Sequence, residues 1–188
     1  ELRSKVSSFA AQYLQVPLIY VNQIGANDNL IFDGNSFILD KNGSKIKQLK
    51  SFSEDLSSWH IKQTIPEKKE FEQSEISSIF DALVLGVRDY AQKCGFKTAL
   101  IGLSGGIDSA LVSAIATAAL GSNNIYCVSM PSKWSSSHSK SDAKDLARRL
   151  KINFNSIPIE NLMNSFEESF IKTISFEMAE ITNQNIQS

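Results

Sequence analysis

Cysteine and long apolar runs are scarce in this chain of 188 residues, and neither sign of charge prevails. Cys94 and Cys127 stand in apolar surroundings, so each is expected to be a small buried side chain in a reducing compartment and not a nucleophile. No apolar run approaches the roughly 20 residues of a membrane helix. A net charge of −1, with basic and acidic residues mixed along the chain, argues against a nucleic-acid surface. We therefore expect a cytoplasmic protein that binds neither membranes nor nucleic acids.

The first third of the chain reads as a helix followed by strands. The range Leu2–Leu14 is predicted to be a helix with Val6, Phe9, Ala10 and Tyr13 on one side. Strands are expected next at Leu18–Gln23, Leu30–Leu39 and Lys45–Phe52. A polar GANDN turn separates the first two, and an Asn-Gly hairpin signal separates the last two. The charged stretch PEKKE then predicts a linker. We place a domain boundary there, giving domains 1–66 and 67–188.

The rest of the chain alternates helices and strands. A helical stripe ended by Gly95 is made by Ile76, Ile79, Phe80, Leu83, Val87, Tyr90, Ala91 and Cys94. An apolar strand at Thr98–Leu103 precedes a helix from Ile107 that stops at Gly121, and further strands are expected at Ile125–Pro131 and Asn153–Ile159. This βαβα alternation predicts an α/β fold with a parallel sheet.

The loop SGGIDS between the first of these strands and its helix carries the main functional signal. Open α/β sheets bind ligands at the carboxyl ends of their strands, and a helix N-terminus attracts anions. Gly105 and Gly106 lack a Cβ, so their amides can approach phosphate oxygens, and Ser104 and Ser109 add hydroxyl donors. Asp108 would repel bare phosphate, so its expected task is to hold Mg²⁺ between itself and the phosphates. The GxxxxGK[ST] and GxGxxG phosphate loops are both absent.

The segment GLSGGIDSALVSA resembles the pyrophosphate-binding loop of the N-type ATP pyrophosphatases, which have an adenine nucleotide alpha-hydrolase-like fold. Relatives with this loop adenylate a substrate and release pyrophosphate. The resemblance implies that ATP contacts the loop at Gly102, Leu103, Ser104, Gly105, Gly106, Ile107, Asp108 and Ser109. Asp108 would be both the catalytic residue and the Mg²⁺ ligand.

Two further segments favour the NAD synthetases within this group. The stretch MPSKWSS, Met130 to Ser136, with the later DA-x-x-LA run, is similar to their active-site loop, in which Ser135 and Ser136 would close over the site; Trp134 stands where tyrosine is usual. The stretch Pro17 to Asp40 is similar to the end of the nitrilase-like glutaminase domain, an α/β sandwich, of glutamine-dependent members. Ala26, Asn27 and Asn29 depart from that pattern.

The resemblance implies ATP-dependent amidation of deamido-NAD to NAD⁺, with ammonia from glutamine, in a homo-oligomer of two or more copies. The glutaminase residues are expected before Glu1 and most of the deamido-NAD site beyond Ser188. This polypeptide alone is therefore expected to be inactive.

Two other functions remain open at this point. Another SGGxDS ligase would make a different product, and a non-catalytic module would only bind ATP or AMP. A structural fragment that works only inside an oligomer is a third alternative.

Overall fold

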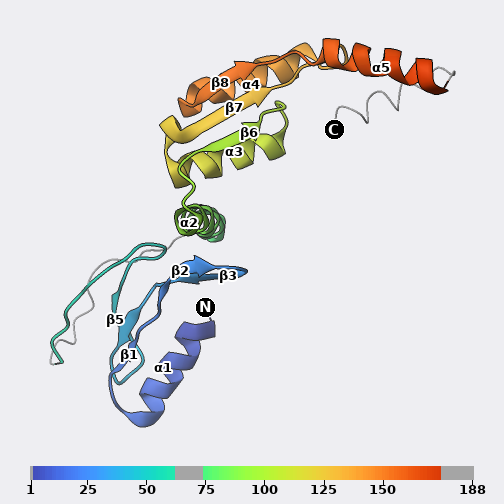
Figure 1. The fold of residues 1–188 in the computed structure, drawn as a ribbon. Coiled ribbons are helices and arrows are strands. Elements are labelled where there is room, and N and C mark those ends of the chain that lie inside the picture. The colour runs from blue at the N-terminus through green and yellow to red at the C-terminus, as the bar shows by residue number, and fades with distance from the viewer. Residues whose placement is uncertain (1, 62–73, 175–188) are drawn as a thin grey trace. The chain divides into compact units, whose positions relative to one another are not determined.

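The computed structural model describes residues 2–61 and 74–174 (Figure 1). The chain divides into two compact units, Glu1–Cys94 and Gly95–Ser188. The boundary predicted between residues 66 and 67 lies outside the described residues and stays a prediction. No helix in the described ranges is both long enough and apolar enough to cross a membrane.

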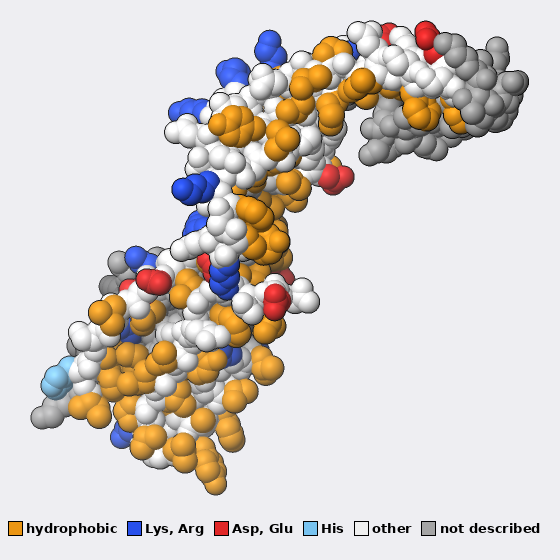
Figure 2. Space-filling model, in the orientation of Figure 1, with side chains coloured by type: hydrophobic (Ala, Val, Ile, Leu, Met, Phe, Trp, Pro, Cys, Tyr) orange, Lys and Arg blue, Asp and Glu red, His pale blue; other side chains and the backbone are white. Residues whose placement is uncertain are grey.

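The N-terminal unit begins with a helix packed on a small antiparallel sheet. Helix α1 (Leu2–Leu14) precedes a sheet of order β1-β4-β5, formed by β1 (Leu18–Tyr20), β4 (Phe37–Leu39) and β5 (Lys45–Gln48). Its core joins Ala11 to Phe37 and Leu39, all three buried. The expected apolar side of α1 is therefore not the packed one. Val6, Phe9 and Tyr13 are exposed, while apolar side chains gather on the visible surface of this unit (Figure 2).

The expected strand Leu30–Leu39 is two strands. Strand β3 (Leu30–Asp33) pairs with β2 (Ile24–Asn27) in a separate hairpin, and β4 belongs to the other sheet. The break falls at Gly34 and Asn35, which both have left-handed backbone, with φ of +65° and +53°. Two consecutive residues of this kind cannot continue a strand, so the chain turns from one sheet into the other.

Helix α2 (Glu75–Cys94) completes the N-terminal unit by packing against the β2–β3 hairpin. Its predicted span is confirmed, and it ends before Gly95, which has φ of +75°. The buried side chains of α2 are Val84, Leu85 and Ala91. Much of the predicted stripe remains exposed within the described structure, namely Ile76, Ile79, Leu83, Val87 and Tyr90.

The C-terminal unit is the predicted parallel α/β fold. Its sheet has the order β6-β7-β8, formed by β6 (Ala99–Gly102), β7 (Ile125–Ser129) and β8 (Asn153–Ser156). The connections run through α3 (Ile107–Leu120), a short 3-10 turn at Ser122–Asn124, and α4 (Ser137–Leu150). Helix α5 (Glu160–Ile174) follows β8. Both strand pairs are parallel, so their carboxyl ends meet at one edge of the sheet.

The core of this unit lies on one face of the sheet. Ile125 and Cys127 of β7 are fully buried and pack with residues of both crossover helices, Ala116, Ala143 and Ala147. The residue between them, Tyr126, faces the opposite side and is 44% exposed, as period-two alternation requires. The packed face therefore holds α3 and α4 against the sheet, with their N-termini toward its carboxyl edge.

Candidate functional site

The predicted phosphate loop lies where β6 ends and α3 begins. Leu103, the first residue after the strand, is 1% exposed, and its N–H donates to the Val128 carbonyl of β7 at 2.9 Å. Helix α3 starts at Ile107, and the N–H of Ala110 donates to the Gly106 carbonyl at 3.1 Å. The loop is thus fixed at both ends, at the edge where open α/β sheets bind ligands.

Two serine hydroxyls hold the loop in shape. The Ser104 and Ser109 hydroxyls lie 3.0 Å apart, and the Gly106 N–H donates to Ser104 Oγ at 3.2 Å. Ser109 Oγ donates to the Gly106 carbonyl at 3.1 Å and accepts from the Ser104 N–H at 3.3 Å. Both hydroxyls therefore form hydrogen bonds within the loop itself.

The two glycines have different roles in this geometry. Gly105 has φ of +88°, and a Cβ built there would lie 2.2 Å from the backbone carbonyl oxygen of Ser139, in the first turn of α4. Gly106 has ordinary extended backbone, φ −84°, and a Cβ there would meet only Ser104 Oγ, at 3.4 Å. Gly105 is therefore required by packing, whereas Gly106 leaves its Cα side open to a ligand.

Within the described structure, the N-terminus of α3 has no side-chain cap. The first N–H groups of a helix have no partner inside it, and they carry about half a positive charge together. By contrast, Ser136 caps α4, since its hydroxyl accepts from the Ser139 N–H at 3.0 Å. The open N-terminus of α3 is thus the natural anion-binding position of this edge.

Asp108 lies in the first turn of α3 and is exposed. Among residues 2–61 and 74–174, no three His, Cys, Asp or Glu side chains are grouped to hold a metal ion. One carboxylate beside a phosphate site still suits Mg²⁺, which binds proteins through one or two carboxylates plus substrate phosphates and water. Asp108 and a phosphate chain could share such an ion.

The serine loop reaches the same edge of the sheet. Ser135 Oγ accepts from the Ser132 N–H at 3.0 Å, and the Ser135 N–H donates to the Ser132 carbonyl at 3.2 Å, which makes a tight turn. Ser136 then caps α4, and the backbone carbonyl of Ser139 in this helix lies against Gly105. The structure therefore brings both predicted loops, including Ser135 and Ser136, to the carboxyl ends of β6 and β7.

Two residues beneath the loop were missed by the sequence reasoning. Ser113 is fully buried, donates from its hydroxyl to the Ser109 carbonyl at 2.8 Å, and lies 3.7 Å from Cys127 Sγ. Ser139 supports Gly105 as described above. A serine four residues after Ser109, within a largely apolar helix, is a signal that could have identified the first. For Ser139 no such signal exists, because its backbone makes the contact.

The two cysteines differ, which corrects one expectation. Cys127 is fully buried in β7, as predicted, but Cys94 at the end of α2 is exposed. The stripe of α2 predicted a buried position because periodicity identifies the apolar side of a helix, whereas the packed side here is set by the β2–β3 hairpin.

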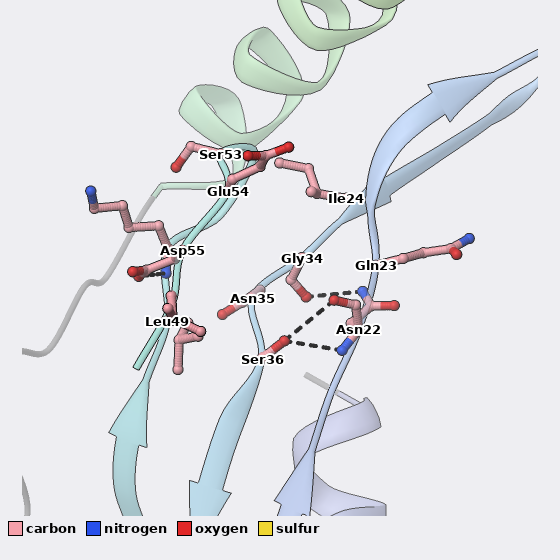
Figure 3. A pocket seen from close by; sticks show the side chains of 12 residues that line it. Asn22, Gln23, Ile24, Gly34, Asn35, Ser36, Leu49, Ser53, Glu54 and Asp55 are labelled. Carbon is pink, nitrogen blue, oxygen red and sulfur yellow. Dashed lines mark hydrogen bonds between the residues drawn. The ribbon is translucent and has the colours of Figure 1, made fainter. Parts of the chain in front are cut away.

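Residues 22–24 and 34–36 of the motif Pro17 to Asp40 line a pocket of about 510 Å³ together with residues of the segment 49–56 (Figure 3). The Asn22 N–H donates to Ser36 Oγ at 3.0 Å, and its side-chain amide donates to Asp33 at 2.8 Å and to the Gly34 carbonyl at 2.9 Å. Arg3 of α1 donates to both oxygens of Asp33, at 2.9 and 2.5 Å, and these bonds hold the pKa of Asp33 below its usual value. In the described structure these motif residues join α1 to the turns between the two sheets.

Comparison with known proteins gives consistent matches. The NAD synthase family model matches residues 79–188. The chain is 42% identical over its full length to the glutamine-dependent NAD(+) synthetase of Synechocystis sp., and 37% identical to that of Rhodobacter capsulatus, of which it covers 34% and 35%. A solved structure of the glutamine-dependent NAD+ synthetase from Acinetobacter baumannii, in complex with adenosine diphosphate, aligns with 98% of the chain at 36% identity and a TM-score of 0.87; the chain covers 36% of it. The chain thus spans about a third of the length of these relatives.

Proposed function

This chain belongs to the NAD synthase family, and we propose that the complete protein carrying it is a ligase that amidates deamido-NAD to NAD⁺ with ATP and glutamine. The observation that supports this most directly is the uncapped N-terminus of α3 behind Gly105 and Gly106, at the carboxyl edge of a parallel sheet. That position suits the phosphates of a nucleotide. The adenosine diphosphate in the Acinetobacter relative is an adenine nucleotide of the same class.

In the proposed reaction, the nicotinate carboxylate of deamido-NAD attacks the α-phosphorus of ATP, and the bond to the bridging oxygen breaks. Negative charge grows on the departing pyrophosphate, next to the segment 102–109. The amides of this segment and the hydroxyls of Ser104 and Ser109 would stabilise that charge. Ammonia then attacks the adenylated carboxyl carbon, and AMP leaves.

Asp108 is the proposed holder of Mg²⁺ at this site. When bound, the ion would add positive charge beside the phosphates. Asp108 itself would orient the phosphate chain through that shared ion. Ser135 and Ser136 lie on the proposed active-site loop, next to the same edge of the sheet.

Glutamine as the nitrogen source is the further part of the proposal. Relatives named glutamine-dependent match the whole chain, including the N-terminal unit. We take the first 66 residues as the end of a nitrilase-like glutaminase domain on the strength of this match and of the motif from Pro17 to Asp40. A homo-oligomer and a cytoplasmic location complete the proposal; the two free cysteines suit a reducing compartment.

The test is Asp108→Asn in the complete protein that carries this sequence. We expect pyrophosphate release that depends on deamido-NAD to fall by about two orders of magnitude or more, a size typical of removing one group that stabilises transition-state charge. Stability should change by no more than about 1 kcal/mol, the worth of a carboxylate in the first turn of a helix. Glu75→Gln, which removes an exposed first-turn carboxylate from α2, is the matched control and should leave turnover unchanged.

Unchanged pyrophosphate release in Asp108→Asn would contradict the proposed role. ATP binding without pyrophosphate release in the unmodified protein would favour the non-catalytic binding module. Pyrophosphate release with a product other than NAD⁺, identified by mass spectrometry, would favour another ligase of the SGGxDS type.

A further inference from the structure

The β2–β3 hairpin has an edge that needs hydrogen-bond partners. Among residues 2–61 and 74–174 it is a sheet of two strands, so each strand has one side without a neighbouring strand there. In an antiparallel pair, alternate residues turn their N–H and C=O away from the partner strand. Ala26 is such a residue, opposite Ile31, and it is 8% exposed. Its backbone groups therefore need partners from elsewhere in the protein.

Helix α2 supplies both partners from adjacent turns. The Ala26 N–H donates to Asp89 Oδ2 at 2.7 Å, and the Ala26 carbonyl accepts from Lys93 Nζ. The same ammonium lies 3.3 Å from Asn27 Oδ1. Asp89 and Lys93 are four residues apart and so share one face of the helix. Together they take the place of a third strand along this edge.

The helix surface is also shaped to receive the hairpin. Gly86, one turn before Asp89, lies where a Cβ would be 3.3 Å from Ile31 Cδ1, so its missing side chain lets Ile31 approach closely. On the hairpin, Gly25 has φ of +131°, and a Cβ there would be 3.3 Å from Asp89 Oδ2. The contact thus combines the two charged side chains of α2 with one close approach at Gly86 on the helix and one at Gly25 on the hairpin.

The position of α2 in the chain gives this contact a consequence. Residues 79–94 of the helix fall within the match to the NAD synthase family model, yet the helix packs in the N-terminal unit. Only the segment 95–98 separates it from strand β6, whose far end carries the phosphate loop. An element of the synthase segment is thus held by a hairpin from the upstream region.

We propose that the β2–β3 hairpin is a clamp on helix α2, that Asp89 and Lys93 are its positioning residues, and that this clamp couples release of nitrogen from glutamine to amide synthesis. The proposal rests on the proposed function. Neither residue contacts a reacting atom in it. Breaking the clamp should therefore impair the use of glutamine without impairing the use of free ammonia.

The experiment compares Asp89→Ala, Asp89→Asn and Lys93→Met with Gln92→Ala in the complete protein. Gln92 is exposed on the same helix turn and serves as the matched control. Hydrogen exchange at the Ala26 amide should quicken about tenfold in Asp89→Ala, since a hydrogen bond to a charged group is lost. Asp89→Asn keeps an acceptor oxygen and should stay near the unmodified protein. Lys93→Met keeps the aliphatic stem and tests the ammonium alone.

NAD⁺ formation is then measured with glutamine and with ammonium chloride as alternative nitrogen sources. We expect Asp89→Ala and Lys93→Met to lower the glutamine-driven rate while the ammonia-driven rate stays as in Gln92→Ala. The proposed clamp would be contradicted if hydrogen exchange at the Ala26 amide quickened while the glutamine-driven and ammonia-driven rates were both unchanged, or were both lowered equally. If the unmodified protein makes no NAD⁺ from either source, the proposed function itself fails.

Discussion

Substituting Gly105 by alanine should damage the C-terminal unit, although the change adds a single methyl group. The methyl would enter a position 2.2 Å from the Ser139 carbonyl oxygen and 2.8 Å from the Ser139 carbonyl carbon and Cα. These are backbone atoms of α4 and cannot rotate away as a side chain would. Either the loop or the first turn of α4 must move.

The size of the effect follows from two terms. Placing a residue with a Cβ at φ of +88° costs about 1–2 kcal/mol. Overpacking against a fixed neighbour typically costs about 1–3 kcal/mol more. We therefore expect the free energy of unfolding of the C-terminal unit to fall by about 2–5 kcal/mol. In urea this lowers the midpoint by about 1 M or more.

Tryptophan fluorescence can follow this unit separately. The chain has two tryptophans, Trp59 and Trp134, so a Trp59→Phe background leaves Trp134 as the reporter in the C-terminal unit. Gly106→Ala in the same background is the matched control. Its backbone is extended, and the new methyl meets only Ser104 Oγ at 3.4 Å, so stability should stay the same or rise by less than about 1 kcal/mol.

Nucleotide titration separates the two glycines a second time. Under the proposed function, the methyl of Gly106→Ala faces the approaching phosphates, so ATP affinity should fall while the urea midpoint does not. Gly105→Ala should lower both the ATP affinity and the urea midpoint. Equal urea midpoints for Gly105→Ala and the unmodified chain would show that the loop does not lie against α4, and the reasoning would be refuted.

Two further predictions concern stability. The pKa of Asp33 is lowered chiefly by its hydrogen bonds from Arg3. The pair therefore stabilises the folded chain above the ordinary carboxyl pKa of about 4, and this stabilisation is lost as the pH falls through the lower pKa of the folded state. Urea unfolding of Arg3→Met between pH 7 and pH 2.5 should lack this acid-dependent loss of stability, and a pH profile identical to that of the unmodified chain would disprove the prediction. Ser136→Ala should lower the free energy of unfolding by about 1 kcal/mol because α4 loses its N-cap, whereas Ser136→Asp should retain stability, as measured by urea unfolding followed at Trp134.

Much of the C-terminal unit could be predicted from the sequence because its local signals agree with its tertiary packing. Helix α3 ends where Gly121 permits positive φ, at +85°, as α2 of the N-terminal unit ends before Gly95, at +75°. The alternation of apolar strand and helix was enough to predict a parallel sheet, which the strand pairing confirms. The phosphate loop lies at the carboxyl edge of the sheet, as predicted, because it follows a strand of that parallel sheet.

The N-terminal unit was harder to predict because its sheets are short and its packing is not set by periodicity. Helix α1 buries Ser7 and Ala11 while Phe9 and Tyr13 stay exposed, so the apolar side of the pattern is not the packed side. The break at Gly34 and Asn35 falls within the polar run DGNS, between the apolar stretches 30–32 and 37–39, and the predicted strand ran through it. That polar run, with its residue types that tolerate positive φ, was the local sign of the turn.

The glycine pair shows why a motif can predict a site without predicting its geometry. Sequence reasoning gave Gly105 and Gly106 one task, the close approach of amides to phosphate. In the structure, the Ser139 backbone occupies the space that a Cβ of residue 105 would need, so the missing side chain of Gly105 permits the contact with α4. Backbone contacts of this kind leave no pattern in the residue types, since any residue at position 139 has a carbonyl. The position of the serine loop beside the phosphate loop therefore follows from Gly105 as much as from the serines.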